Sequence, residues 1–166
     1  RCRYLFVSKN FKFGFKRKGN IKTLKKFEKL FNYKNIITSA YKKNNRTISS
    51  TIIRKKIRAG KIELVNKLLN RPWCIEGRVI KGKKRGRKIG FPTCNIRLDS
   101  YVIPKLGVYA VKVHDKSFNK NGIANIGYRP TFNGQSLLLE TNIFGISKNL
   151  YNKVINVSFK KFLRPE

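Results

Sequence analysis

The run Val154-Ile155-Asn156-Val157-Ser158-Phe159 decides the fold class of this chain. Its apolar side chains alternate with polar ones, so the segment has one apolar face and one polar face, which is typical of a half-buried β-strand. Similar short runs occur upstream, separated by Gly, Pro and Asn residues that favour turns. These runs are Val79-Ile80, Val108–Val113, Gly122–Ile126 and Leu137–Phe144. Several short strands at this spacing predict a small closed β-barrel, which is all-β.

The first seventy residues have a different period and indicate an α/β segment. The expected elements, in order, are a strand at 4–7, a helix at 21–32, a strand at 36–37 and helices at 50–59 and 62–69. Ser49 or Ser50 can cap the second of these helices, and Gly60 ends it by taking the left-handed conformation. Helical periodicity stops at Pro72. We therefore expect two domains, one at residues 1–71 and one at residues 72–166.

Charge is the strongest feature of the composition, with 40 Lys and Arg against 7 Asp and Glu and a formal net charge of +33. Such a surface attracts polyanions, and nucleic acid is the first partner that it suggests. The basic residues are nevertheless spread along the chain rather than gathered on one element, and segments such as Lys42-Lys43-Asn44-Asn45 are simply solvated. We therefore expect no specific nucleic-acid partner, and we interpret the charge as compositional drift that also steers phosphate-bearing substrates.

The cysteines and the hydropathy pattern bear on the cellular compartment. Cys2, Cys74 and Cys94 form no CxxC pair and no disulfide framework, which favours a reducing, cytoplasmic compartment. No apolar run approaches the roughly 18–20 residues that span a bilayer, so we expect no membrane partner. The single histidine, His114, is expected to be a surface or turn residue rather than a catalytic one. The oligomeric state stays open.

The glycine-rich and basic segment from Gly82 to Asn95 is the first candidate for chemistry. Its glycines let the backbone approach a ligand, and the N–H groups of such turns converge into an anion-binding nest, while Lys and Arg complement phosphate charge. The phosphate-binding candidates are Gly82, Lys83, Gly86, Arg87, Gly90 and Thr93. A loop of this kind, taken alone, is more often a solvated basic hairpin, so the assignment depends on the residues that follow.

Two oxygen-bearing residues come directly after this loop. Pro92 stiffens the entry to a strand, and Thr93 and Asn95 are two residues apart, so their side chains project to the same face. A hydroxyl and an amide oxygen are hard ligands that suit Mg²⁺ beside substrate phosphates. The alternative is a structural cross-strand pair of hydrogen-bonding side chains.

Glu140 interrupts the otherwise apolar run Leu137–Phe144 in a chain that has few carboxylates. A carboxylate in a strand is costly to bury unless it is paired, so its presence needs a reason. One reading is a general base, and the other is an outward-facing strand residue with no role in chemistry.

Together these motifs resemble the riboflavin kinase family over residues 72–166. The matching segments are Gly77–Gly82, Gly86–Asn95, Gly107–Ala110, Asn125–Phe132, Leu139-Glu140 and Phe162–Glu166. The resemblance implies a six-stranded Greek-key barrel that uses ATP and Mg²⁺ to phosphorylate riboflavin to FMN. The family signature Pro-Thr-Ala-Asn reads Pro92-Thr93-Cys94-Asn95 here, and the family's catalytic carboxylate maps onto Glu140. The phosphate-binding candidates named above would then hold ATP.

Residues 1–71 resemble the end of the FMN adenylyltransferase domain of bacterial bifunctional FAD synthetases, through residues 10–19 and Ile48–Arg54. This resemblance implies a truncated Rossmann-like nucleotidyltransferase segment in a parent protein that also adenylates FMN to FAD. Ser50, Thr51 and Arg54 would be the remnant of its phosphate-facing site, because a capped helix N-terminus attracts phosphate. We expect the upstream ATP motif and the helix that closes the kinase domain to lie outside this chain.

Two other functions compete with the kinase. A basic barrel of this kind can hold RNA, as OB-type folds do, and would then need neither Asn95 nor Glu140. A degenerate flavin-binding domain without catalysis is the second alternative. Formation of FMN from riboflavin and ATP would separate the kinase from both.

Overall fold

A computed structural model describes residues 2–39, 42–43, 46–82, 92–98, 100–131, 134–146 and 148–166. The chain divides into two compact units, Arg1–Ser49 and Ser50–Glu166, which are treated separately below. Within the described residues, no helix has the length and apolar character needed to cross a membrane.

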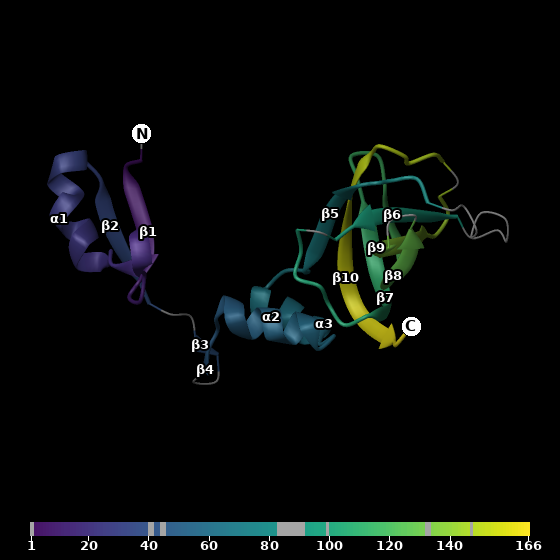
Figure 1. Ribbon diagram of the computed structural model, residues 1–166, viewed down its shortest axis with the longest axis horizontal. Helices are drawn as coiled ribbons and strands as arrows, with labels where there is room; N and C mark the ends of the chain where they lie inside the picture. The colour runs from purple at the N-terminus through teal and green to yellow at the C-terminus, as the bar shows by residue number, and fades with distance from the viewer. Residues whose placement is uncertain are drawn as a thin grey trace. The chain divides into compact units, whose positions relative to one another are not determined.

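The first unit is built on a strand–helix–strand motif (Figure 1). Strands β1 (Tyr4–Ser8) and β2 (Lys34–Thr38) pair in parallel, and helix α1 (Ile21–Phe31) connects them. Asn20 caps α1 because its side-chain oxygen accepts hydrogen bonds from the backbone N–H of Lys22 and Thr23, at 2.8 and 3.3 Å. The expected strands and helix of this region are therefore present. The remaining elements are η1 (Phe15–Arg17), β3 (Lys42–Lys43) and β4 (Arg46–Thr47).

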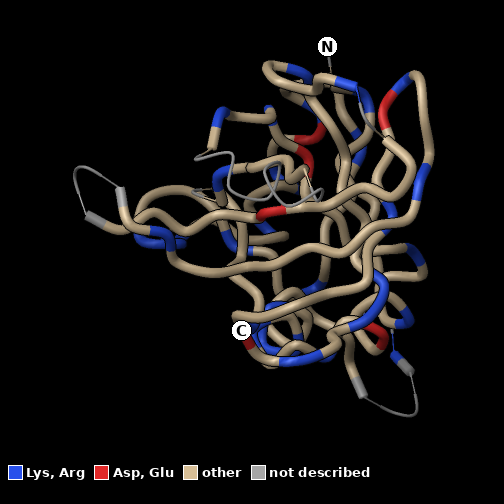
Figure 2. The backbone as a smooth tube through the Cα atoms, turned by 90° about the vertical axis from the view of Figure 1, so that its right-hand side faces the viewer, with Lys and Arg blue, Asp and Glu red and all other residues tan. Residues whose placement is uncertain are grey.

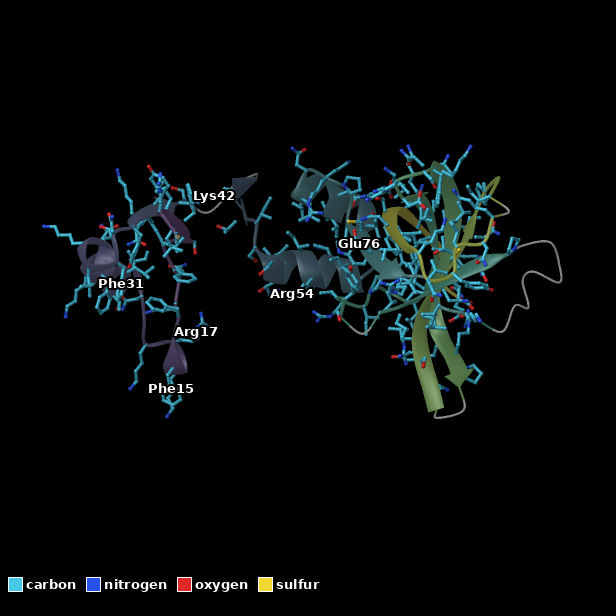
Figure 3. All side chains as sticks on the ribbon, turned by 90° about the horizontal axis from the view of Figure 1, so that it is seen from above. Phe15, Arg17, Phe31, Lys42, Arg54 and Glu76 are labelled. Carbon is cyan, nitrogen blue, oxygen red and sulfur yellow. The ribbon has the colours of Figure 1, made fainter. Side chains whose placement is uncertain are left out.

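This unit leaves much apolar surface exposed. Among the described hydrophobic side chains only Val7 and Leu24 are buried here, whereas Phe6, Phe15 and Phe31 are more than half exposed. Figure 3 shows Phe15 and Phe31 projecting from the ribbon of this unit. Parallel strands are normally covered on both faces, and a two-stranded sheet with one helix cannot provide that cover.

The second unit begins with two short helices, α2 (Ser50–Arg58) and α3 (Ile62–Leu69). Gly60 lies between them with a φ of +70°, the left-handed conformation that the sequence predicts. Helix α3 is joined to the barrel by Asn66, whose amide donates to the carbonyl of Phe159 at 2.9 Å and accepts from the backbone N–H of Trp73 at 2.7 Å. The compact units thus divide at Ser49–Ser50, and the domain boundary after residue 71 stays a prediction.

The rest of this unit is a six-stranded, antiparallel and nearly closed barrel (Figure 1). Its strands are β5 (Cys74–Arg78), β6 (Thr93–Arg97), β7 (Gly107–His114), β8 (Asn119–Thr131), β9 (Gly134–Ile143) and β10 (Val154–Arg164). They follow the order β5-β10-β7-β8-β9-β6. The backbone N–H of Ile80 donates to the carbonyl of Asn95 at 2.9 Å, so the segment after β5 meets β6 and brings the two edges of the sheet together.

The barrel interior holds the core. Ile155, Val157 and Phe159 of β10 are at most 1% exposed, which confirms the alternation that predicted this strand. The ring of Phe159 contacts those of Trp73 and Tyr109, with centroid distances of 4.8 and 5.1 Å. Such aromatic contacts add to the stabilisation that burial of apolar area provides.

One strand prediction is wrong. Val79-Ile80 is not a strand, and β5 lies at Cys74–Arg78 instead, paired with β10. The polar residues Glu76 and Arg78 obscure the apolar pattern there. Gly77 between them is required by packing, because a Cβ atom at this position would lie 2.3 Å from Cγ2 of Ile96.

Candidate active site

Strand β6 presents the predicted pair of oxygen-bearing side chains on one face. Cys94 and Ile96 point toward the barrel core, so Thr93 and Asn95 share the opposite face. The Thr93 side chain is exposed, whereas Asn95 is only 5% exposed. The Oδ1 atom of Asn95 is buried and has no hydrogen-bond partner among the described residues. An acceptor of this kind is costly to bury without a partner.

Glu140 lies next to this pair in space. Strands β6, β9 and β8 pair in a register that places Asn95, Glu140 and Asn125 opposite one another, in one row across three strands. Residues that face each other in neighbouring strands project to the same face of the sheet. The structure therefore brings the predicted base to the predicted metal ligands, although the strands that carry them are far apart in the chain.

Arg129 holds the Glu140 carboxylate. Its Nε and Nη2 atoms lie 2.9 and 2.8 Å from Oε2 of Glu140. Charge-assisted hydrogen bonds of this kind are stronger than neutral ones. The two side chains are 31% and 29% exposed, so the pair is only partly screened by solvent. Glu140 is thus neither a free surface carboxylate nor an unpaired buried one.

A second carboxylate completes this arrangement. Arg129 also donates through Nη1 to Oε1 of Glu166, and the amide of Asn125 donates to the same oxygen at 2.9 Å. Hydrogen bonds from Arg129 and then Asn125 hold the pKa of the Glu166 carboxyl below its usual range. Desolvation acts to lower the pKa of Arg129, but the hydrogen bonds and charges of both carboxylates outweigh it and raise that pKa. Sequence reasoning gave none of these three residues a role.

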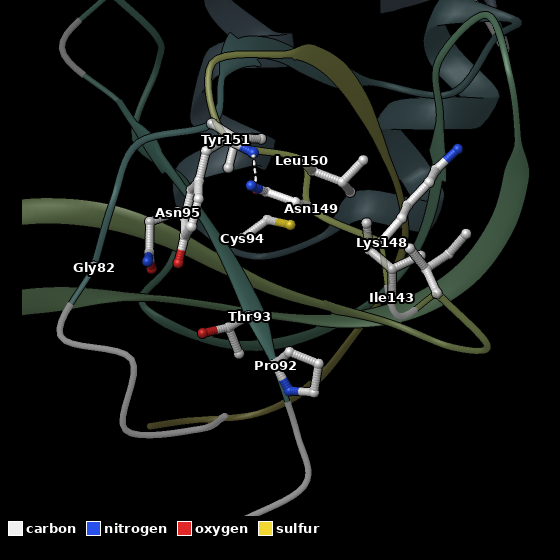
Figure 4. A pocket seen from close by; sticks show the side chains of 12 residues that line it. Gly82, Pro92, Thr93, Cys94, Asn95, Ile143, Lys148, Asn149, Leu150 and Tyr151 are labelled. Atoms are coloured by element: carbon white, nitrogen blue, oxygen red, sulfur yellow. Dashed lines mark hydrogen bonds between the residues drawn. The ribbon is translucent and has the colours of Figure 1, made fainter. Parts of the chain in front are cut away.

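A cavity of about 390 Å³ opens beside Thr93 and Asn95 (Figure 4). Its lining comes from the end of the β5 segment, from β6 and from the connection between β9 and β10, and includes Gly82, Cys94, Lys148 and Tyr151. Gly82 is required by a close approach, since a Cβ atom there would lie 2.1 Å from Nδ2 of Asn95. Burial raises the pKa of the Cys94 thiol to about 11, so this side chain stays a neutral wall of the cavity at neutral pH.

The described residues include only part of the predicted phosphate-binding set. Lys83, Gly86, Arg87 and Gly90 lie outside the described residues. Gly82 and Thr93, which flank that loop in the sequence, both line the cavity. The cavity therefore lies where the two described members of the predicted phosphate-binding set meet.

The remaining candidates lie elsewhere. Ser50 begins α2, and Arg54 donates to its hydroxyl at 3.0 Å, so these two residues contact each other one helical turn apart, with Thr51 between them. His114 ends β7 with an exposed side chain. Within the described segments, no group of three or more His, Cys, Asp or Glu side chains is placed to hold a metal. Lys and Arg occur on nearly every segment of the backbone (Figure 2).

A six-stranded barrel is the fold that the family resemblance implies, and the comparison of sequences agrees. The family model described as riboflavin kinase (flavokinase) matches residues 69–166. This match covers more than half of the chain, and the chain therefore belongs to the riboflavin kinase family.

Relatives extend the likeness to the first unit. The bifunctional riboflavin kinase/FMN adenylyltransferase of Haemophilus influenzae is 44% identical over 165 residues, which are 99% of this chain and 54% of that protein. The protein of the same name from Buchnera aphidicola of Schizaphis graminum is 45% identical over 169 residues, with 99% and 54% covered. The chain thus spans about half the length of the curated relatives it matches.

A solved structure matches as well. It is the crystal structure of a protein from Streptococcus pneumoniae that is named as a macrolide-efflux protein. That protein is 32% identical in sequence, and the TM-score is 0.76 over 96% of this chain and 51% of the other. The name applies to the streptococcal protein alone, and the likeness to this chain is one of sequence and fold.

Proposed function

We propose that this chain transfers the γ-phosphate of ATP to the 5′-hydroxyl of the ribityl chain of riboflavin, giving FMN and ADP. Membership of the riboflavin kinase family supports this reaction. The observation that carries it is the placement of Glu140 opposite Asn95, a residue that lines the cavity together with Gly82 and Thr93. Asn95 would thus connect the proposed base, its neighbour in the sheet, with the cavity proposed for the phosphates of ATP.

Glu140 is the general base in this proposal. Its carboxylate accepts the proton of the ribityl hydroxyl as the oxygen forms a bond to the γ-phosphorus. The bond from that phosphorus to the β–γ bridging oxygen breaks, and its electron pair leaves with ADP. The ion pair with Arg129 supports this role, because the guanidinium fixes the carboxylate on the face of the sheet that it shares with Asn95. Phosphoryl transfer depends mainly on positioning and charge stabilisation, so one base and a rigid sheet are sufficient protein chemistry.

Thr93 and Asn95 are the residues that would hold a divalent metal, which the use of ATP by kinases implies. The buried Oδ1 of Asn95, which has no hydrogen-bond partner in the described part of the chain, fits such an ion, and the hydroxyl of Thr93 on the same face adds a second oxygen. We assign the ion as Mg²⁺ because both donors are hard oxygen ligands and the ion keeps its other positions for water and phosphate. When bound, Mg²⁺ neutralises charge on the phosphates of ATP.

The parent protein, in this proposal, also adenylates FMN to FAD, as the names of the relatives state for those proteins. The parallel β1–α1–β2 motif supports a truncated Rossmann-like nucleotidyltransferase segment within residues 1–71. Ser50, Thr51 and Arg54 at the start of α2 would be its phosphate-facing remnant. Catalysis of this kind needs all groups that hold the reacting phosphate, so we expect these 166 residues to make FMN and no FAD.

The test is product formation with and without Glu140. The chain is incubated with riboflavin, ATP and Mg²⁺, and flavins are separated by chromatography. We expect FMN from the unsubstituted chain, and a loss of roughly 10²–10⁴-fold in rate for Glu140→Gln with riboflavin binding retained, because the amide cannot accept the proton. Glu76→Gln, at an exposed carboxylate of β5, is the matched control and should behave as the unsubstituted chain. Near-normal FMN production by Glu140→Gln would remove Glu140 from the mechanism.

A further inference from the structure

Two nitrogen atoms of the Arg129 guanidinium donate to a single carboxylate oxygen of Glu140. Nε and Nη2 both donate to Oε2 of Glu140, at 2.9 and 2.8 Å, rather than to one oxygen each. Among the described residues, no hydrogen bond engages the other oxygen, Oε1. A guanidinium usually meets a carboxylate with two parallel bonds, one to each oxygen. Here one oxygen is held and the other is left to accept a proton.

Arg129 is itself fixed from the opposite side. Its third nitrogen, Nη1, donates to Oε1 of Glu166, which follows β10, and to the carbonyl of Tyr128 at 3.0 Å. The amide of Asn125 donates to the same Glu166 oxygen at 2.9 Å. Gly127 leaves the room that this requires, because a Cβ atom there would lie 2.3 Å from Oε2 of Glu166. The guanidinium of Arg129, on β8, is therefore held between Glu140 of β9 and Glu166, which follows β10.

We propose that Arg129 is a positioning residue for the kinase reaction: it holds Glu140 by Oε2 so that Oε1 faces the ribityl hydroxyl, and Glu166 holds Arg129 in turn. This inference rests on the proposed function of Glu140. A glutamate side chain in a strand has three rotatable bonds, and restricting them in advance removes an entropic cost from the chemical step. Arg129 also separates two carboxylates that would otherwise repel each other.

The test uses a double-mutant cycle in the 166-residue chain. Arg129→Met should lower kcat by roughly 10²-fold, because a base displaced by about an ångström is no longer in reach, while KM for riboflavin and for ATP changes little. Arg129→Lys, which keeps the charge but not the fork, should recover part of that loss. The combined Arg129→Met/Glu140→Gln variant should be no slower than Glu140→Gln alone, since Arg129 acts through Glu140.

The outcomes separate this inference from the function on which it rests. If the unsubstituted chain forms no FMN, the kinase assignment fails. If it forms FMN but the losses of the two single variants multiply in the double variant, Arg129 acts independently of Glu140 and the positioning role is refuted. An unchanged kcat in Arg129→Met refutes it too. Arg71→Met, at an exposed arginine before β5, is the control for loss of a positive charge and should keep the unsubstituted chain's kcat.

Discussion

Substitution of Gly82 by alanine should disturb the proposed metal–phosphate site, formed by Gly82, Thr93 and Asn95, because it adds one carbon atom beside Asn95. The new Cβ atom would lie 2.1 Å from Nδ2 and 3.1 Å from Cγ of Asn95, well inside ordinary contact distance. Gly82 does not have a φ in the left-handed range, so alanine fits the backbone and the conflict is purely steric. Asn95 is only 5% exposed, so its amide must turn or shift by about an ångström within a packed site. A displacement of that size at a positioned ligand costs up to roughly 10²-fold in rate.

The assay is FMN formation as a function of Mg²⁺ and ATP concentration, together with the thermal unfolding midpoint. We expect Gly82→Ala to raise KM for Mg·ATP or lower kcat by about 10–10²-fold, with riboflavin binding affected less. Gly77→Ala is the matched control, because its Cβ atom would lie 2.3 Å from Cγ2 of Ile96 and overpack the core away from the cavity. That change should cost roughly 1–3 kcal/mol of stability yet spare the Mg²⁺ dependence. Unaltered kinetics in Gly82→Ala would refute the placement of Asn95 at the metal–phosphate site.

Three further predictions concern the metal ligands, the buried thiol and the charge. Thr93→Val and Asn95→Leu should each weaken Mg·ATP binding more than riboflavin binding, and an unchanged Mg²⁺ dependence of FMN formation in both would make the pair structural. For a pKa of about 11, only about one Cys94 thiol in a thousand is ionised at pH 8. Iodoacetamide should therefore label the exposed Cys2 well before Cys94, as followed by mass spectrometry. Prompt labelling of Cys94 would contradict its burial. Fluorescence anisotropy should show nucleic-acid binding that is weak, sequence-blind and steeply salt-dependent, and tight binding of one sequence at physiological salt would favour the RNA-binding alternative.

The periodicity of the sequence was sufficient to predict those features of the fold and the site that depend on a single strand. The alternation of Ile155, Val157 and Phe159 predicted β10, and all three side chains are in the core. The two-residue spacing of Thr93 and Asn95 likewise predicted their common face. Strand β5 was missed because Glu76 and Arg78 break the apolar pattern on which such predictions depend.

Features that depend on pairing between strands could not be read from the sequence. Glu140 meets Asn95 only because β6 and β9 pair in a particular register, and a slip of one residue would put Glu140 on the other face. The ion pairs of Arg129 with Glu140 and Glu166 depend on the register of β8 and β9 and also on the position of Glu166 after β10. Helical spacing in residues 50–69 predicted two helices but not that they pack with the barrel, since an amphipathic face does not identify its partner.

The central claim is that this chain moves the γ-phosphate of ATP to riboflavin. The most direct measurement supplies ATP labelled at the γ-phosphate together with riboflavin and Mg²⁺, and follows the label by chromatography. The account predicts that the label appears in FMN, depends on Mg²⁺, falls roughly 10²–10⁴-fold in Glu140→Gln and never appears as FAD. Label that stays in ATP or is released only as inorganic phosphate, while riboflavin is bound but unchanged, would contradict it.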